Sequence, residues 1–171
     1  EAERTIVALG QKIASLAGRS RTVRTRLAAE KSVESRARLI GLLGMMGDPA
    51  ALPVLRSAIR ERDSEIVDAA VRAMAAWPTG AAREDLMALA RDLRNETHRL
   101  LAIQGLIRTI GLDTYRDAPA VVADLRLAAG FAWRTDERRL VLGVLGRFPC
   151  AEALDLASGF LQDPVLNKEA Q

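Results

Sequence analysis

The side chains best suited to catalysis or metal binding are few in this chain. His98 is the only histidine and Cys150 the only cysteine, and neither belongs to a set with metal-ligand spacing. A nucleophilic cysteine or serine needs a partnered base, and phosphate binding by a loop needs a glycine-rich motif; we find neither arrangement. We therefore expect no enzyme activity, no metal and no cofactor. His98 is predicted to have a surface or capping role, and Cys150 to be a small, partly buried residue at a helix start.

Arginine offers a different kind of chemistry. Four arginines fall at matched places when the predicted second helices of a repeat are aligned, with Arg56 opposite Arg126 and Arg60 opposite Arg94. A ladder of guanidinium groups on one face would recognise carboxylates or phosphates. The alternative is that each arginine pairs with a nearby acid, such as Glu61, on a solvated helix. The spacing leaves both interpretations open.

Positive charge is concentrated at the N-terminal end. Residues 1–47 carry nine basic and four acidic side chains, whereas the net charge of the whole chain is only +3. Arg19 and Arg24 belong to the basic stretch 19–38, which could attract nucleic acid, another polyanion or an acidic partner. The same stretch could equally be a solvated helix face.

A six-residue phrase indicates the elements that position these side chains. It recurs at residues 42–47, 73–78, 106–111 and 144–149, each time with apolar residues at its first, second and fifth places and a helix breaker at its end. The copies start 31, 33 and 38 residues apart, within the range of about 20–50 residues that is typical of helical repeats. The sequence therefore predicts an all-α repeat protein.

Each repeat is predicted to be a pair of antiparallel helices. In the clearest pair, an apolar stripe at spacings of three, four and seven predicts a helix over residues 33–46, and Gly47, Asp48 and Pro49 end it and start the next helix. The predicted pairs are residues 33–62, 65–94, 97–131 and 136–162, with a degenerate pair at 2–31 and the start of a further helix at 163–171.

Glycines inside the predicted helices need an explanation, because each costs about 1 kcal/mol relative to alanine. Gly41 and Gly44 are three residues apart, as are Gly143 and Gly146 in another repeat. We predict that these four positions allow close approach between helices of successive layers.

The segments at residues 43–55 and 145–154 resemble bacterial HEAT repeats, an armadillo-like family whose short form is also found in phycobilisome lyases. The resemblance covers nearly the whole chain and implies a right-handed α-solenoid of four to five repeats, with the second helices lining a concave surface. It also suggests that residues 1–171 form one HEAT domain of a longer protein.

The resulting functional prediction is a non-catalytic protein-interaction or scaffold module that uses this concave face. Its partner would be another protein or another domain of the same polypeptide, and the alternative is a nucleic-acid or polyanion binder. A HEAT-like DNA glycosylase would need an aromatic residue and a carboxylate among basic side chains, as in Trp133, Asp136, Arg138 and Arg139, but no family motif accompanies them. The interpretation as a bilin lyase likewise has no supporting feature in the sequence beyond the repeats. No apolar run reaches the length of about 20 residues that a membrane span needs, and the sequence leaves the compartment open.

Overall fold

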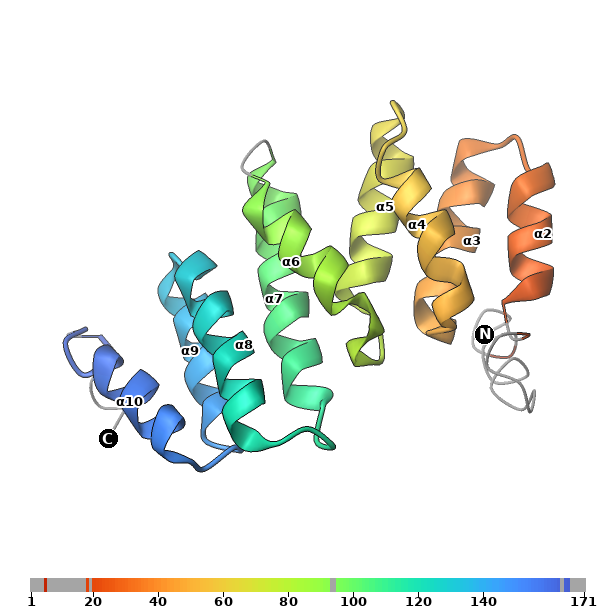
Figure 1. The fold of residues 1–171 in the computed structure, drawn as a ribbon. Helices are drawn as coiled ribbons and strands as arrows, with labels where there is room; N and C mark the ends of the chain where they lie inside the picture. Colours follow the sequence, from red (N-terminus) through yellow and green to blue (C-terminus); the bar gives the residue numbers. More distant parts are fainter. Residues whose placement is uncertain (1–4, 6–17, 19, 93–94, 164, 167–171) are drawn as a thin grey trace. The chain divides into compact units, whose positions relative to one another are not determined.

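The computed structural model describes residue 5, residue 18 and residues 20–92, 95–163 and 165–166, and all regular structure among them is helical (Figure 1). The all-α prediction is confirmed. The chain divides into two compact units, Glu1–Asp85 and Leu86–Gln171. Its α-helices are α2 (Arg21–Ala29), α3 (Val33–Met46), α4 (Leu52–Ala58), α5 (Ser64–Ala75), α6 (Arg83–Arg91), α7 (Glu96–Leu112), α8 (Ala118–Phe131), α9 (Thr135–Leu145) and α10 (Ala151–Phe160), with short 3₁₀ helices η2 (Pro49–Ala51) and η3 (Gly80–Ala82).

Unit 1 is organised around α3, which packs against both α2 and α5, while α4 packs against α5. Helix α3 covers the predicted range 33–46. Its apolar stripe forms the core, since Ile40 and Leu43 are fully buried. The predicted degenerate pair contributes α2 as its second helix, and the first helix of that pair falls outside the described residues.

The turn after α3 follows the predicted capping chemistry. Gly47 adopts a left-handed conformation with φ of 63° and donates its N–H to the carbonyl of Leu43, as is common at the C-terminal end of a helix. The Asp48 side chain then accepts the N–H of Ala50, and Pro49 occupies the first helical position. The new helix starts as a 3₁₀ turn, which the sequence pattern did not indicate.

Only one of the four intrahelical glycines behaves as predicted. A Cβ atom added at Gly44 would lie 2.7 Å from the Cβ atom of Ala73 on α5, so α3 and α5 approach closely there. Gly41 and Gly143 have nothing within 4 Å, and Gly146 meets only a carbonyl of its own helix at 3.8 Å. The prediction is therefore wrong for these three glycines, because none of them faces a neighbouring helix.

Unit 2 contains two layers of the same kind. Helix α7 packs against α8 and α9, and α10 packs against α8 and α9. The core includes Ile103, Leu106, Val122, Leu125 and Val141, all fully buried. The close approach between α7 and α9 occurs at Gly111, where an added Cβ would lie 3.0 Å from the side chain of Val144.

In three of the helix pairs, an arginine near the start of the first helix donates a hydrogen bond to a group at the C-terminal end of the second helix. The contacts are Arg36 Nη2 to Glu61 at 2.7 Å, Arg138 Nη1 to Asp163 at 3.0 Å, and Arg99 Nη1 to the carbonyl of Phe131 at 3.1 Å. These arginines hold equivalent places in the repeat. Sequence reasoning missed this role, although the separation of 25 residues in the first two contacts was visible in the chain.

The fifth place of the recurring phrase is buried in every copy. Met46, Trp77, Ile110 and Phe148 have exposed fractions of 6%, 0%, 0% and 7%. The apolar residue at this place of the phrase thus contributes to the core in all four copies. No helix among the described residues is long and apolar enough to cross a membrane.

Candidate functional site

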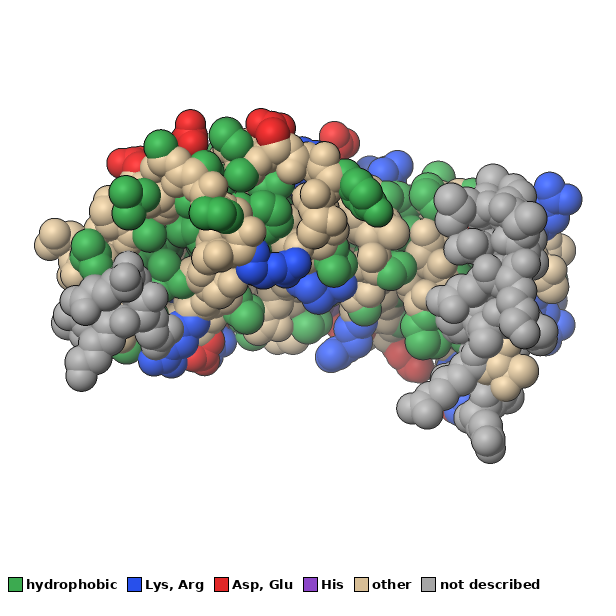
Figure 2. All heavy atoms as spheres, turned by 90° about the horizontal axis from the view of Figure 1, so that it is seen from below, with side chains coloured by type: hydrophobic (Ala, Val, Ile, Leu, Met, Phe, Trp, Pro, Cys, Tyr) green, Lys and Arg blue, Asp and Glu red, His purple; other side chains and the backbone are tan. Residues whose placement is uncertain are grey.

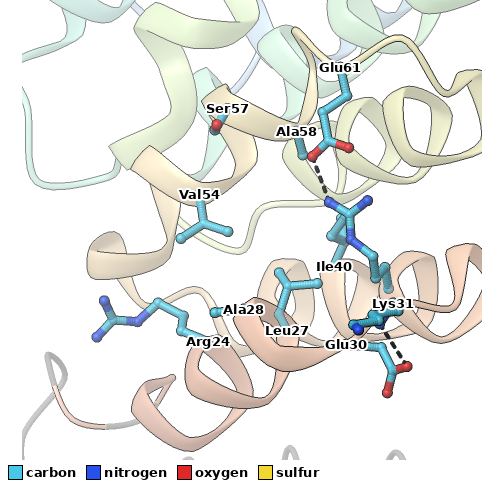
Figure 3. Close-up of a pocket in the computed structure, with 11 residues that line it drawn as sticks. Arg24, Leu27, Ala28, Glu30, Lys31, Ile40, Val54, Ser57, Ala58 and Glu61 are labelled. Carbon is cyan, nitrogen blue, oxygen red and sulfur yellow. Dashed lines mark hydrogen bonds and ion pairs between the residues drawn. The ribbon is translucent and has the colours of Figure 1, made fainter.

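A groove of about 500 Å³ lies within unit 1 (Figure 3). Helix α2 and the residues just after it form one wall, α4 and the turn after it form the other, and α3 contributes the floor. Both walls come from predicted second helices, the helices that the resemblance to HEAT repeats assigned to the binding face.

Aliphatic side chains form the base of the groove. Leu27 of α2, Ile40 of α3 and Ala58 of α4 are buried at its base, and Val54 is half-buried on the α4 wall. Ala28 is exposed on the α2 wall, opposite α4 (Figure 3). An aliphatic side chain of a partner would therefore meet aliphatic atoms on three sides.

The two carboxylates of the groove already have partners. Glu61 accepts a hydrogen bond from Arg36 at 2.7 Å, and this bond raises the pKa of the Arg36 guanidinium. Glu30 accepts the backbone N–H groups of Ser32 and Lys31, which lower the pKa of its carboxyl group, and it also accepts a side-chain bond from Arg26. Both acids thus form hydrogen bonds within the fold.

Two cations of the groove are not used in this way. Arg24 and Lys31 form no ion pair with a carboxylate of the described residues, although Arg24 Nε donates to the hydroxyl of Ser20 at 2.9 Å. Arg24 belongs to α2, whereas Lys31 follows the end of that helix, and the two lie toward opposite ends of the groove (Figure 3). The groove therefore has an aliphatic base, with Arg24 at one end and Lys31 at the end that also holds Glu30 and Glu61 (Figure 3).

A buried carboxylate positions the α2 wall. Asp48, which is fully buried, accepts the N–H and the hydroxyl of Ser20 at 3.0 and 2.7 Å, and Ser20 directly precedes α2. Burial acts to raise the pKa of Asp48, but the hydrogen bonds from Ser20 and Ala50 outweigh it and the pKa is lowered. The turn after α3 is thereby tied to the start of α2.

Two arginines of the predicted ladder form ion pairs with aspartates of the same chain. Arg56 donates to both oxygens of Asp85 at 2.6 and 2.9 Å, and Arg126 donates to Asp155 at 2.6 Å. In both cases the acid lies 29 residues further on, in the next second helix. The matched placement of Arg56 and Arg126 is therefore real, and the repeated Arg-to-Asp spacing of 29 residues is the signal that sequence reasoning missed.

The remaining predicted binding residues divide into three groups. Arg60 is exposed in the turn after α4 and does not line the groove. Arg24 lines it. Arg19 and Arg94 lie outside the described residues. Of the six arginines singled out in the sequence, one thus contributes to the groove.

We expect the Arg56 ion pair to contribute little to stability, because Arg56 is 47% exposed and solvent screens the charges. Replacing Arg56 by alanine should lower the free energy of unfolding by less than about 1 kcal/mol. A double-mutant cycle with Asp85→Ala, measured by urea unfolding, should give a coupling energy of about 0.5 kcal/mol. A coupling energy above about 2 kcal/mol would contradict this expectation.

A second, smaller groove of about 310 Å³ lies in unit 2 between α9 and α10. Its lining is mostly apolar and includes Leu142, Pro149 and Leu154, the last of which is 74% exposed. Figure 2 shows hydrophobic side chains gathered over the C-terminal half of the face that it views. Cys150 borders this groove as the residue before α10 and is half-buried, as predicted.

The residues considered for DNA-glycosylase chemistry are engaged in the fold. Trp133 stacks on the guanidinium of Arg99, 4.1 Å from the ring centroid, and its backbone N–H is bound by Glu137. Arg138 binds the carbonyl of Ala132 as well as Asp163. His98 donates its backbone N–H to Asn95 at the start of α7, and no group of three potential metal ligands lies among the described residues.

Comparison with known proteins gives one match. A family model described as HEAT repeats matches residues 21–107, from the first residue of α2 into α7. Searches of curated proteins and of solved structures found no significant match. The matched segment includes every residue that lines the larger groove.

Proposed function

The chain belongs to the HEAT-repeat family, and from this premise we propose that it is a non-catalytic protein-interaction module that binds its partner in the groove between α2 and α4. Members of this family serve generally as protein-interaction scaffolds, while repeat folds as such do not specify a partner. A bacterial source, the phycobilisome-lyase type and the organisation of residues 1–171 as one domain remain predictions.

The observation that carries the proposal is the groove itself. It has an apolar base, polar and charged edges, and walls formed by consecutive second helices. Its volume of about 500 Å³ lies within the range of roughly 300–1,000 Å³ typical of binding pockets. An apolar base surrounded by polar groups is also the usual composition of a protein-binding surface.

Polyanion binding, the alternative function, has weaker support. Within residues 20–38 three of the arginines, Arg26, Arg36 and Arg38, form ion pairs with Glu30, Glu61 and Glu34. Three of the nine basic side chains counted in residues 1–47 are therefore paired with acids of the same chain. A phosphate backbone would also gain nothing from the apolar base.

Photo-crosslinking in a lysate of the source organism tests the proposal. We expect p-benzoylphenylalanine incorporated at Ser57, on the α4 wall, to form cross-linked partner species. The Ala28→Trp substitution should fill the groove and abolish these species, whereas Thr25→Trp, at an exposed site on the same helix outside the groove, should leave them unchanged. Incorporation at Tyr115, which is fully exposed in unit 2, controls for nonspecific reaction.

Equal cross-linking at Ser57 and Tyr115 would overturn the proposal, and so would cross-linking that persists in the Ala28→Trp protein. Because Ala28 is an exposed helix residue, the substitution should leave the fold intact, which circular dichroism can verify.

A further inference from the structure

Building on the proposed function, we infer that the groove between α2 and α4 selects an acidic peptide segment with an aliphatic anchor. The aliphatic side chain occupies the base of the groove, and carboxylates of the segment on either side of it pair with Arg24 and Lys31. This assigns a chemical class to the partner and a role to each wall.

The base of the groove sets the requirement for the anchor. Leu27, Ile40 and Ala58 present only aliphatic atoms and are almost fully buried, while Val54 closes one side. A polar or charged side chain placed here would lose its hydration without gaining a hydrogen bond to these residues. An aliphatic side chain instead gains about 25 cal/mol for each Å² of apolar surface removed from water.

The charges of the groove set the requirement for the flanking residues. Glu61 is bound to Arg36, and Glu30 is bound to two backbone N–H groups and to Arg26. A cationic peptide would have to compete with these contacts. An anionic peptide breaks no ion pair, because neither Arg24 nor Lys31 forms one with a carboxylate of the described residues; Arg24 acts on the buried Asp48 only at longer range, across Ser20.

The positions of the two cations set the order of residues in the segment. Arg24 and Lys31 lie toward opposite ends of the groove, with Leu27 between them (Figure 3). The expected segment therefore has acidic residues on both sides of its anchor.

Selection from a displayed library of random 12-residue peptides tests the inference without a known partner. Peptides enriched by the wild-type protein and lost with Ala28→Trp are those that enter the groove. We expect these peptides to carry net negative charge and a Leu, Ile or Val between the acidic residues. The same selection with Thr25→Trp should return the same peptides as the wild type.

The enriched peptide is then measured against a charge-neutralised protein. Replacing Arg24 and Lys31 together by glutamine should raise its Kd about tenfold at low salt. A matched control, Arg62→Gln with Arg72→Gln, removes the same charge at exposed positions outside the groove and should change Kd by less than twofold. Lys31→Gln alone leaves the hydrogen bond between Arg24 and Ser20 intact and should therefore not affect folding. An increase in Kd of about threefold with this variant would then reflect binding alone.

The outcomes distinguish the inference from the function on which it rests. If the groove-dependent peptides were basic or uncharged, the inference of an acidic peptide would be wrong, but the proposed interaction module would still hold. An unchanged Kd in the Arg24→Gln/Lys31→Gln protein would have the same consequence. If no enriched peptide depends on Ala28, both the inference and the proposed function fail. Tighter groove-dependent binding of a fluorescein-labelled oligothymidylate than of any peptide would instead assign the groove to nucleic acid.

Discussion

Replacing Asp48 by alanine is expected to lower the free energy of unfolding by about 3 kcal/mol. The carboxylate accepts three hydrogen bonds, from the N–H and hydroxyl of Ser20 and from the N–H of Ala50, and both Asp48 and Ser20 are fully buried. Hydrogen bonds to a charged group contribute about 1.5–3 kcal/mol each, and the cost of burying the carboxylate offsets part of their sum. Urea unfolding followed by circular dichroism measures the change.

A second aspartate provides the matched control. Asp63 caps α5 by accepting the N–H groups of Glu65 and Ile66, but it is only half-buried and its contacts are local. Asp63→Ala should therefore cost about 1 kcal/mol, the usual value for an N-cap. If the two substitutions lowered the free energy of unfolding equally, the hydrogen bonds between Ser20 and Asp48 would add no stability beyond that of an ordinary helix cap.

Asp48 also makes the stability of the protein depend on pH in the acid range. Because the pKa of Asp48 is lower in the folded protein than in the unfolded chain, where it is about 3.9, its contribution is fully present well above pH 4. That contribution is lost as the pH falls through the lowered pKa. We expect the difference in unfolding free energy between the wild type and Asp48→Asn to shrink between pH 6 and pH 2. A difference that stays constant over this range would contradict the lowered pKa.

Alanine at Gly44 and at Gly41 should have opposite effects on stability. A Cβ atom at Gly44 would lie 2.7 to 2.9 Å from the Cβ, Cα and carbonyl oxygen of Ala73, and backbone cannot rotate away. We expect Gly44→Ala to destabilise the protein by about 2 kcal/mol, since overpacking costs about 1–3 kcal/mol. Gly41 has open space around its Cα atom, so Gly41→Ala should stabilise the helix by up to about 1 kcal/mol.

Thermal or urea unfolding of the two variants side by side checks this pair. The helix-propensity gain is shared by both substitutions, so the difference between them isolates the packing of α3 against α5. A Gly44→Ala protein as stable as Gly41→Ala would show that the two helices do not approach as closely as the structure describes. In that case Ala73→Gly would also fail to rescue the Gly44→Ala variant.

Local signals in the sequence were sufficient to define the elements. The apolar stripe of residues 33–46 marks α3 from end to end, and Gly47, Asp48 and Pro49 end it and start the next helix as expected. The recurring phrase placed Met46, Trp77, Ile110 and Phe148 in the core. These predictions succeed because helix periodicity and capping depend on residues only a few positions apart.

The candidate site required the tertiary structure. The sequence identified Arg24 as basic but could not show that it lies beside an apolar groove, and it could not tell which acids would occupy Arg56 and Arg126. Asp85 and Asp155 are 29 residues away, and the groove joins side chains of three helices. The sequence alone was enough to predict the helices and the capped turn at Gly47, Asp48 and Pro49, because these follow from contacts within one or two turns of the chain. That Gly44 packs closely while Gly41 does not, and that Arg24 and Lys31 form no ion pair with a described carboxylate, could be learned only from the folded structure, because both depend on the rotation and separation of helices distant in sequence.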